Sequence, residues 1–457
     1  MMKRLVERVN IWAGGDAVVN NGAILLDGGT IEAVLTHEEL AECEIPAAVE
    51  RIDGGGRLAI PGLVNAHTHL YSSLARGMSL PGFAPTSFTQ ILEQLWWRLD
   101  KALDAESVRT SAVVGAMEAA RCGVTSLIDH HASPYAVPGS LEGLRKAVCD
   151  DVGLRGVFCY EVSDRDGEEI ALAGIEENRS FLSDQSLTAR SSTDHPADDR
   201  LSAGLFGLHA SFTLSDATLE RVASSLPEGV GIHIHVAEGP EDEMQCVAEH
   251  GLRIVERLDR FGMLRPTSIL AHCLHLDEAE KDLLSARNVI VAHNPRSNMN
   301  NAVGAFDLDG SLGRNLLVGL GTDGLGANML AELFTAALFQ KASRNDPLAA
   351  PFPSLHRLLF ENNPRIVERT LGVKVGRISP GYPADIAILD YIPPTPLSGD
   401  TILGHILFGI AVHSLRVTDL FVAGRAVLRD GRFCDFDEDE VYAHAREQAA
   451  RLWRGAV

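Results

Sequence analysis

The sequence predicts an α/β protein: a (β/α)8 TIM barrel with a small β-sandwich domain built from both chain termini. Three observations predict this fold. Apolar strand patterns alternate with helical patterns along the middle of the chain, short β-branched runs occupy both ends, and residues that can bind a metal follow several central strands. Alternating strands and helices are typical of parallel β/α units. Such barrels carry their chemistry at the carboxyl ends of their strands.

Composition and charge restrict the class of protein. The chain has 457 residues, of which 46% are hydrophobic, so it can fill a large core. Its 40 Lys and Arg against 62 Asp and Glu give a formal net charge of −22, which opposes binding to nucleic acid or to an anionic membrane. Residues 1–15 lack the apolar run of a secretory signal, and no uncharged apolar run reaches membrane-spanning length. We therefore expect a cytoplasmic protein without a nucleic-acid or membrane partner.

The cysteine pattern argues against disulfides and against a thiolate zinc site. The seven cysteines are odd in number and contain no C-x-x-C pair. We expect most of them to be small buried apolar side chains. This includes Cys273, which follows a candidate histidine but has no predicted activating base nearby.

Both ends of the chain predict β-structure. Residues 3–38 and 376–433 contain short β-branched runs separated by Gly, Pro and Asn-Gly or Asp-Gly turn signals. The two ends can share one sheet if the middle of the chain is inserted between them. We therefore expect a composite β-sandwich domain from residues 1–58 and 372–437, a barrel from residues 59–371, and a C-terminal helix at residues 438–457.

The middle of the chain contains eight candidate strands with helical patterns between them. Eight such units over about 300 residues are the layout of a (β/α)8 barrel. The polar run 183–200, which includes His195, lacks apolar periodicity and predicts a surface loop. The candidate strands cover residues 62–67, 124–129, 156–162, 205–210, 231–237, 268–273, 289–294 and 316–323.

Two of these strands carry paired histidines. The first ends in His67 and His69, and because side chains alternate along a strand, both imidazoles point to the same side and can bind one cation. The fifth alternates apolar residues with His233 and His235, so both face the barrel axis and one of them can be a third ligand. An isolated His-x-His pair also occurs in ordinary proteins, so the prediction depends on the combination.

Three further candidates follow barrel strands. Glu238 follows the fifth strand, where its carboxylate can move a proton between an attacking water and a leaving group; alone it would be an ordinary helix N-terminal carboxylate. His272 ends the sixth strand and can polarise a carbonyl or help to deprotonate water. Asp323 ends the eighth strand and can complete the metal site or accept a proton, while the neighbouring glycines leave space for ligands.

These residues and several motifs make the chain resemble the amidohydrolase superfamily. It is similar to the mononuclear metal-dependent deaminase branch, which includes cytosine, guanine and methylthioadenosine deaminases, and within that branch to the SsnA-type aminohydrolases. The motifs that carry the resemblance are IPGLVNAHTH at 60–69, HASFT at 209–213, HVAE at 235–238, AHC at 271–273, HNPRSN at 293–298, GTDG at 321–324 and PGYPADIAILD at 380–390.

The resemblance implies that one divalent metal ion is bound, with zinc expected first and iron second. It also implies that Glu238 shuttles a proton, that His272 lies beside the water and the substrate, and that His209 faces the substrate. No lysine falls at a barrel strand end, where dinuclear relatives carry a bridging lysine, so we expect a single ion. The implied metal ligands are His67, His69, His235 and Asp323.

Two positions depart from the better-known deaminases. His130 and His131 follow the second strand and could add a substrate contact or a weak second metal site. Gln90 falls near the place where methylthioadenosine enzymes carry a purine-binding glutamate, which argues against the same selectivity. We assign Gln90 and His130, together with His209, as candidate substrate-binding residues.

The predicted function is hydrolytic deamination of an amino-substituted nitrogen heterocycle of the purine, pterin or pyrimidine type through a metal-bound hydroxide. The predicted catalytic residues are Glu238, His272 and Asp323. One alternative is an amidohydrolase that opens a cyclic amide or ureide ring with the same metal site. Another is a non-catalytic scaffold, which the complete ligand set disfavours. By resemblance alone, we expect a homodimer.

Overall fold

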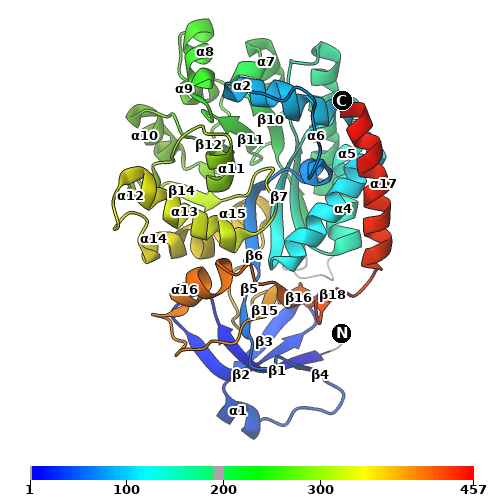
Figure 1. The fold of residues 1–457 in the computed structure, drawn as a ribbon, viewed down its shortest axis with the longest axis vertical. Helices are drawn as coiled ribbons and strands as arrows, with labels where there is room; N and C mark the ends of the chain where they lie inside the picture. The colour runs from blue at the N-terminus through cyan, green and yellow to red at the C-terminus, as the bar shows by residue number, and fades with distance from the viewer. Residues whose placement is uncertain (1–2, 189–199, 457) are drawn as a thin grey trace.

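The computed structural model describes residues 3–188 and 200–456, so the predicted loop residue His195 lies outside the described residues. It contains a barrel above a smaller β unit (Figure 1). This arrangement confirms the predicted fold class. Among the described residues, no helix is long and apolar enough to cross a membrane.

The barrel is a closed ring of parallel strands. One run of paired strands is β6-β7-β8-β9 and the other is β10-β11-β12-β13-β14. Parallel bridges between Val162 and Leu208 and between Thr68 and Asp323 join the two runs. The strands are β6 (Leu63–Thr68), β7 (Val124–His131), β8 (Arg155–Tyr160), β9 (Ser202–Gly204), β10 (Phe206–Ala210), β11 (Ile232–Val236), β12 (Ile269–His272), β13 (Ile290–His293) and β14 (Leu317–Leu320).

Helices follow the strands and cover the outside of the ring, as the alternating pattern predicts. Asp104 and Ser107 form a capping box at the start of α4 (Ala105–Arg121). The predicted surface loop at 183–200 is wrong at its start, because α6 continues to Thr188. These helices are α4 (Ala105–Arg121), α5 (Ser140–Arg145), α6 (Glu168–Thr188), α7 (Asp216–Ser225), α8 (Pro240–His250), α9 (Ile254–Arg260), α10 (Glu278–Arg287), α11 (Pro295–Asn300), α12 (Leu308–Gly313), α13 (Met329–Arg344), α14 (Phe352–His356) and α15 (Asn363–Leu371).

A long excursion after β6 lies on the side of the barrel away from the small β unit, where α2 is visible at the top of Figure 1. It contains η1 (Leu70–Ala75), α2 (Phe88–Ile91), η2 (Leu92–Trp96) and α3 (Trp97–Ala102). The C-terminal helix α17 (Glu438–Ala456) packs beside α3 and α4, where Trp453 Nε1 donates to the Leu74 carbonyl at 2.7 Å.

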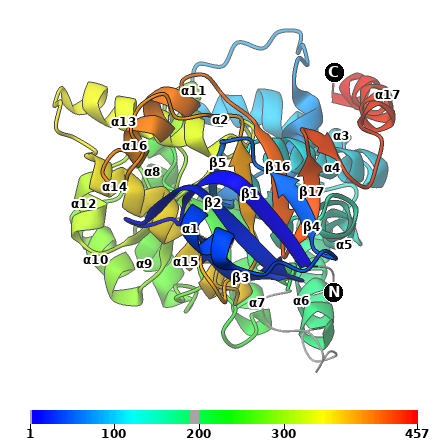
Figure 2. The ribbon, with the colours of Figure 1, turned by 90° about the horizontal axis from the view of Figure 1, so that it is seen from below.

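The smaller unit is a nine-stranded sheet to which both ends of the chain contribute. Figure 2 shows the blue N-terminal strands beside the orange C-terminal strands beneath the barrel. β5 pairs antiparallel with β15 and so joins the two ends. The exact domain limits stay a prediction. The strands are β1 (Lys3–Trp12), β2 (Val18–Asp27), β3 (Thr30–Leu35), β4 (Glu50–Asp53), β5 (Leu58–Pro61), β15 (Ile386–Leu389), β16 (Val417–Val422), β17 (Arg425–Arg429) and β18 (Arg432–Phe433).

A buried ion pair connects the sheet to the barrel. Arg155 of β8 donates through Nε and Nη2 to both carboxylate oxygens of Asp385, at 2.8 and 3.0 Å. Both side chains are at most 1% exposed. The Ala423 amide also donates to Asp385 at 2.7 Å. Charges taken out of water cost free energy unless they are paired, so each partner depends on the other.

We expect Asp385→Ala to lower the free energy of unfolding by about 3–5 kcal/mol, because the Arg155 charge stays buried without its partner. Urea denaturation measures this change. Glu176→Ala removes the partner of Arg179 from an exposed pair and serves as a control, with an expected change of about 0.5 kcal/mol or less. Equal changes in the two variants would contradict a structural role for the buried pair.

Candidate active site

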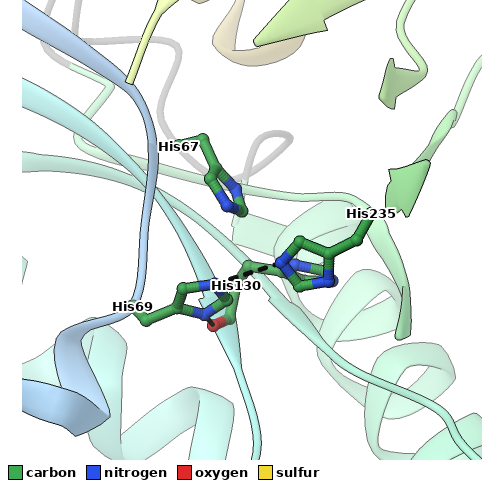
Figure 3. Close-up of side chains that lie close together, drawn as sticks. All are labelled: His67, His69, His130 and His235. Atoms are coloured by element: carbon green, nitrogen blue, oxygen red, sulfur yellow. Dashed lines mark hydrogen bonds between the residues drawn. The ribbon is translucent and has the colours of Figure 1, made fainter. Parts of the chain in front are cut away.

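The six residues predicted to carry the chemistry come together at the carboxyl end of the barrel. They lie at or just beyond the ends of β6, β11, β12 and β14. Figure 3 shows the rings from the first and fifth barrel strands facing one another, with the ring of His130 beside them. The six residues are His67, His69, His235, Glu238, His272 and Asp323.

Two of the imidazoles are fixed by backbone carbonyls. Nδ1 of His69 donates to the carbonyl oxygen of His130 at 2.6 Å. Nδ1 of His235 donates to the carbonyl oxygen of His209 at 2.9 Å. A proton on Nδ1 leaves Nε2 of each neutral ring with a free lone pair. The neighbouring strands therefore set both the orientation and the tautomer of these two rings.

Side chains fix the other two imidazoles in the same way. Nδ1 of His272 donates to Oδ1 of Asn298 at 2.7 Å. Nδ1 of His67 lies 2.9 Å from Nε2 of His233, the other histidine that was predicted to face the barrel axis. Partners of this kind orient metal-binding histidines in proteins.

The Nε2 atoms converge on Asp323. Nε2 of His69 lies 3.0 Å from Oδ1 of Asp323 and 3.2 Å from Nε2 of His235. Nε2 of His67 lies 3.6 Å from the same oxygen, and Nε2 of His272 lies 3.7 Å from Oδ2. The buried Nε2 atoms of His67 and His272 have no hydrogen-bond partner. Buried lone pairs around a carboxylate fit a divalent cation such as zinc.

Among the described residues, possible donor atoms form three overlapping groups, each within 4.8 Å, and one of them comprises Glu161, His209 and His235. Of the two groups that contain His67, one comprises His67, His235, His272 and Asp323, and the other comprises His67, His69, His130 and His235. The predicted ligand set draws on both groups, and its assignment stays a prediction.

His130 was predicted as a substrate contact, but its ring is fully buried beneath the site. It stacks on His233 with ring centroids 4.3 Å apart and lines neither cavity at the site. His130 instead joins His67, His69 and His235 in one group of possible metal donors, so the predicted alternative of a weak second metal site stays a prediction.

The pKa values of the two carboxylates of the site are shifted in opposite directions. Burial, reinforced by the charge of Asp323, raises the pKa of Glu238 to about 8. Burial acts in the same direction on Asp323, but the adjacent imidazoles of His67 and His69 hold the pKa of Asp323 well below its usual value. At neutral pH, Glu238 can therefore donate a proton while Asp323 can accept one.

The short helix α11 and the residue after it contact both carboxylates. Oγ of Ser297 donates to Oδ2 of Asp323 at 2.5 Å, and Nδ2 of Asn301 donates to Oε1 of Glu238 at 3.1 Å. The same helix supplies Asn298, the partner of the β12 histidine. Sequence reasoning did not assign Ser297 or Asn301, although the HNPRSN motif marked the segment.

Four positions at the strand ends adopt a left-handed backbone that L-residues rarely occupy. The φ angles are 48° at Ala237, 71° at His272, 54° at Cys273 and 55° at Asp323. Such conformations cost free energy and cluster at functional sites. Here they turn the chain just where it presents the site carboxylates and the sixth-strand histidine.

The glycines near Asp323 have different roles. We expected them to leave space for ligands. A Cβ at Gly321 would lie 2.8 Å from the carbonyl oxygen of His67, so this glycine allows β14 to approach β6. Gly324 and Gly326 do line the larger of two cavities at the site.

The smaller cavity, of about 50 Å³, lies directly over the histidines and has aromatic and charged walls. His209 lines it, as predicted, with Nδ1 2.9 Å from the hydroxyl of Thr213. Glu161 also lines it and lies 3.3 Å from Nδ1 of His69, a contact that the sequence did not predict. The other walls are formed by Tyr71, Phe88, Leu92, Trp96, Trp97, Asp100, Arg165, Ala210, Phe212, Asp242 and Asn301.

Gln90 lines neither cavity. Its side-chain oxygen accepts hydrogen bonds from the amide and the hydroxyl of Thr86, at 2.8 and 3.0 Å. The residue therefore stabilises the loop before α2, and its position does not support the predicted substrate contact.

Comparison with known proteins identifies the family. The model of the Amidohydrolase family matches residues 58–427, which include the whole barrel. The chain belongs to the Amidohydrolase family. This confirms the superfamily that the motifs indicated, and the predicted class of hydrolase acting on carbon–nitrogen bonds agrees with it.

Relatives match almost the full length of the chain. A 5-methylthioadenosine/S-adenosylhomocysteine deaminase of Pelotomaculum thermopropionicum is 31% identical over 96% of both chains. A 5'-deoxyadenosine deaminase of Methanopyrus kandleri is 32% identical, also over 96% of both chains. A similar solved structure is the crystal structure of an adenosine deaminase from Xanthomonas campestris with bound zinc. Its sequence is 26% identical to this chain, and the two structures match with a TM-score of 0.81 over 99% of this chain and 98% of that one.

We expect His233→Leu to weaken zinc binding by about 10- to 100-fold, because His67 loses the partner of its Nδ1 atom. His233→Gln keeps a side-chain oxygen that can accept the Nδ1 proton and should lose less affinity. Competition with a chromogenic chelator measures both variants without a substrate. His275→Leu is the control, since His275 contacts the Val303 carbonyl away from the site. Unchanged zinc affinity in His233→Leu would contradict the supporting role.

Proposed function

We propose that this protein is a metal-dependent aminohydrolase that removes the amino group from a nitrogen heterocycle. The observation that carries the proposal is the convergence of buried, partnerless imidazole Nε2 atoms on Asp323 beside Glu238, whose pKa is raised. The relatives support it, because two are named as deaminases of adenosine-type compounds and are at least 31% identical to this chain.

The metal ligands in this proposal are His67, His69, His235 and Asp323. A bound divalent ion acts as a Lewis acid and lowers the pKa of a water to about 7. Zinc is the first choice, because imidazole and carboxylate donors suit it and the Xanthomonas relative contains it. Iron is the second choice.

The residues around this centre divide the proton transfers. Asp323 and His272 accept the proton of the attacking water, and Glu238 protonates the ring nitrogen next to the reacting carbon. Glu238 then takes the second proton of the water oxygen and passes it to the departing amino group, and the proton held by Asp323 restores neutral Glu238. The carbon gains the water oxygen, the carbon–nitrogen bond breaks, and ammonia leaves. Asn301 and Ser297 keep the two carboxylates in position through their hydrogen bonds.

The smaller cavity suits a flat heterocycle of the purine, pterin or pyrimidine type. Phe88, Trp97 and Phe212 offer ring faces and edges for stacking. The guanidinium of Arg165 lies 5.4 Å from the Trp97 ring centroid and pairs with the buried carboxylate of Asp100. The side chains of Arg165 and Asp100 can hydrogen-bond to ring nitrogens and to exocyclic groups of the substrate.

We also propose that the enzyme is a cytoplasmic homodimer. All seven cysteines are free thiols, which suits a reducing compartment. Leu338 of α13 and Phe408 and Val412, at and just after η7 (His405–Ala411), are exposed and lie on adjacent helices. Exposed apolar side chains that gather in one place are typical of an interface, and a second copy of the chain is the proposed occupant.

Glu238→Gln should retain the metal ion and lose most turnover, by about 100- to 10,000-fold, because the amide cannot carry the proton. His235→Ala should lose both metal and turnover. Metal analysis of the purified variants, together with ammonia release, separates the two effects. A Glu238→Gln enzyme with a normal rate would remove Glu238 from the mechanism.

Product analysis distinguishes deamination from the opening of a cyclic amide or ureide. We expect stoichiometric ammonia and a product that keeps most of the ring's ultraviolet absorbance, because only the exocyclic carbon–nitrogen bond breaks. A screen of aminopurines, pterins, aminopyrimidines and cyclic ureides with the zinc-loaded enzyme provides the substrates. Loss of absorbance without ammonia would favour ring opening and contradict the proposal.

A further inference from the structure

A second, larger cavity opens onto the same reacting centre. Its volume is about 510 Å³, within the range of typical small-molecule sites. It shares His69, Trp96, Asn301 and Asp323 with the smaller cavity. A ligand whose reacting atom lies at Asp323 can therefore extend into both cavities at once.

The walls of the larger cavity come mainly from three segments: the excursion after β6, one face of α4, and the loop after Asp323. β6 adds Asn65 and Thr68, β7 adds Leu127, and the end of α11 adds Asn300 and the following Asn301. Most of the side chains that these segments contribute are apolar. The apolar wall residues are Leu70, Ala75, Met78, Phe83, Pro85, Ile91, Leu95, Trp96, Ala119, Leu127, Leu325 and Ala327.

The charges in this cavity, apart from the shared site residues, neutralise each other. Arg76 donates two hydrogen bonds to the carboxylate of Glu118, at 2.5 and 2.7 Å. The hydroxyl of Ser72 already donates to the carbonyl oxygens of His69 and Gly324. The cavity therefore offers no unpaired cation for a phosphate or a carboxylate, and a charged group that entered it would lose hydration without gaining a partner.

From this geometry, we propose that the larger cavity binds an uncharged apolar substituent of the substrate, such as an alkyl, alkylthio or aryl group. The inference rests on the proposed function, because it takes the heterocycle to lie in the smaller cavity with its reacting carbon at Asp323. The substrate class is thus an aminoheterocycle with an apolar substituent on the side of the ring away from the polar residues Asp100 and Arg165.

A homologous series of ligands tests this subsite. Aminopurines and aminopyrimidines with methyl, ethyl, propyl or butyl groups at each free ring position provide the substrates. For one position, we expect kcat/KM to rise about fourfold for each added methylene, since each buried methylene is stabilising by a similar amount. For a substrate whose chain has the same length but ends in a carboxylate, kcat/KM should be at least about tenfold lower than for the methyl-ended compound. A flat or falling alkyl series at every position would overturn the proposal.

Two variants localise the effect to the larger cavity. Ala327→Phe fills it, and Phe83→Ala removes a wall residue that is 44% exposed, so folding is little affected. Each should reduce the ratio of kcat/KM for the butyl compound to that for the methyl compound by at least about tenfold. Ala342→Phe adds the same ring at an exposed position of α13 and is the matched control. Ratios in all three variants equal to the wild-type ratio would overturn the assignment to this cavity.

Binding measurements separate failure of the subsite from failure of the proposed function. Alkylpurines that lack the amino group are not substrates, and calorimetry gives their dissociation constants with the zinc-loaded protein. We expect affinity to rise with chain length in the wild type and to rise much less in Ala327→Phe. Such a rise without ammonia release from any aminoheterocycle would support the subsite and refute deamination. Ammonia release with dissociation constants independent of chain length would support deamination and refute the subsite.

Discussion

The anchoring of four imidazoles through their Nδ1 atoms is the constraint on which the site depends. Each Nδ1 has a partner in the structure, so each Nε2 faces a common centre. Lone pairs in a water-poor interior repel one another and lack hydrogen bonds, which makes the arrangement unfavourable without a cation. Strand geometry and side-chain partners thus hold these rings in an arrangement that suits a divalent metal ion. This explains why the supporting residues matter as much as the ligands.

The same burial creates the difference between the two carboxylates. Asp323 lies beside several imidazoles, which stabilise its charge. The pKa of Glu238, in contrast, is raised because the side chain is buried and lies near the charge of Asp323. One residue is therefore ready to accept a proton and the other to donate one, although both are carboxylates a short distance apart. α11 and the residue after it maintain this division, because Ser297 and Asn301 contact one carboxylate each.

The sequence was sufficient to predict the barrel, the strand ends that carry the site, and the residues that converge there. These features follow from strand periodicity and from parallel β/α topology, which are local and regular. The partners of the site residues were not predictable in this way. Contacts such as that of Asn301 with Glu238 depend on how a short helix from one strand end lies across another, which no periodicity encodes. Gln90 illustrates the same limit, because its loop turns the side chain back to Thr86.

The small β unit also contributes to the site through the position of β6. β5 ends at Pro61 in the shared sheet, and β6 begins at Leu63 in the barrel, so only Gly62 separates the two. The Gly62 amide donates to the carbonyl oxygen of Asp385 at 2.9 Å, and a Cβ at this position would lie 2.3 Å from the Thr125 side chain. With so short and crowded a connection, the register of β6 cannot shift independently of the sheet. Since His67 and His69 stand at the far end of β6, the sheet built from both ends of the chain helps to fix where the paired histidines lie.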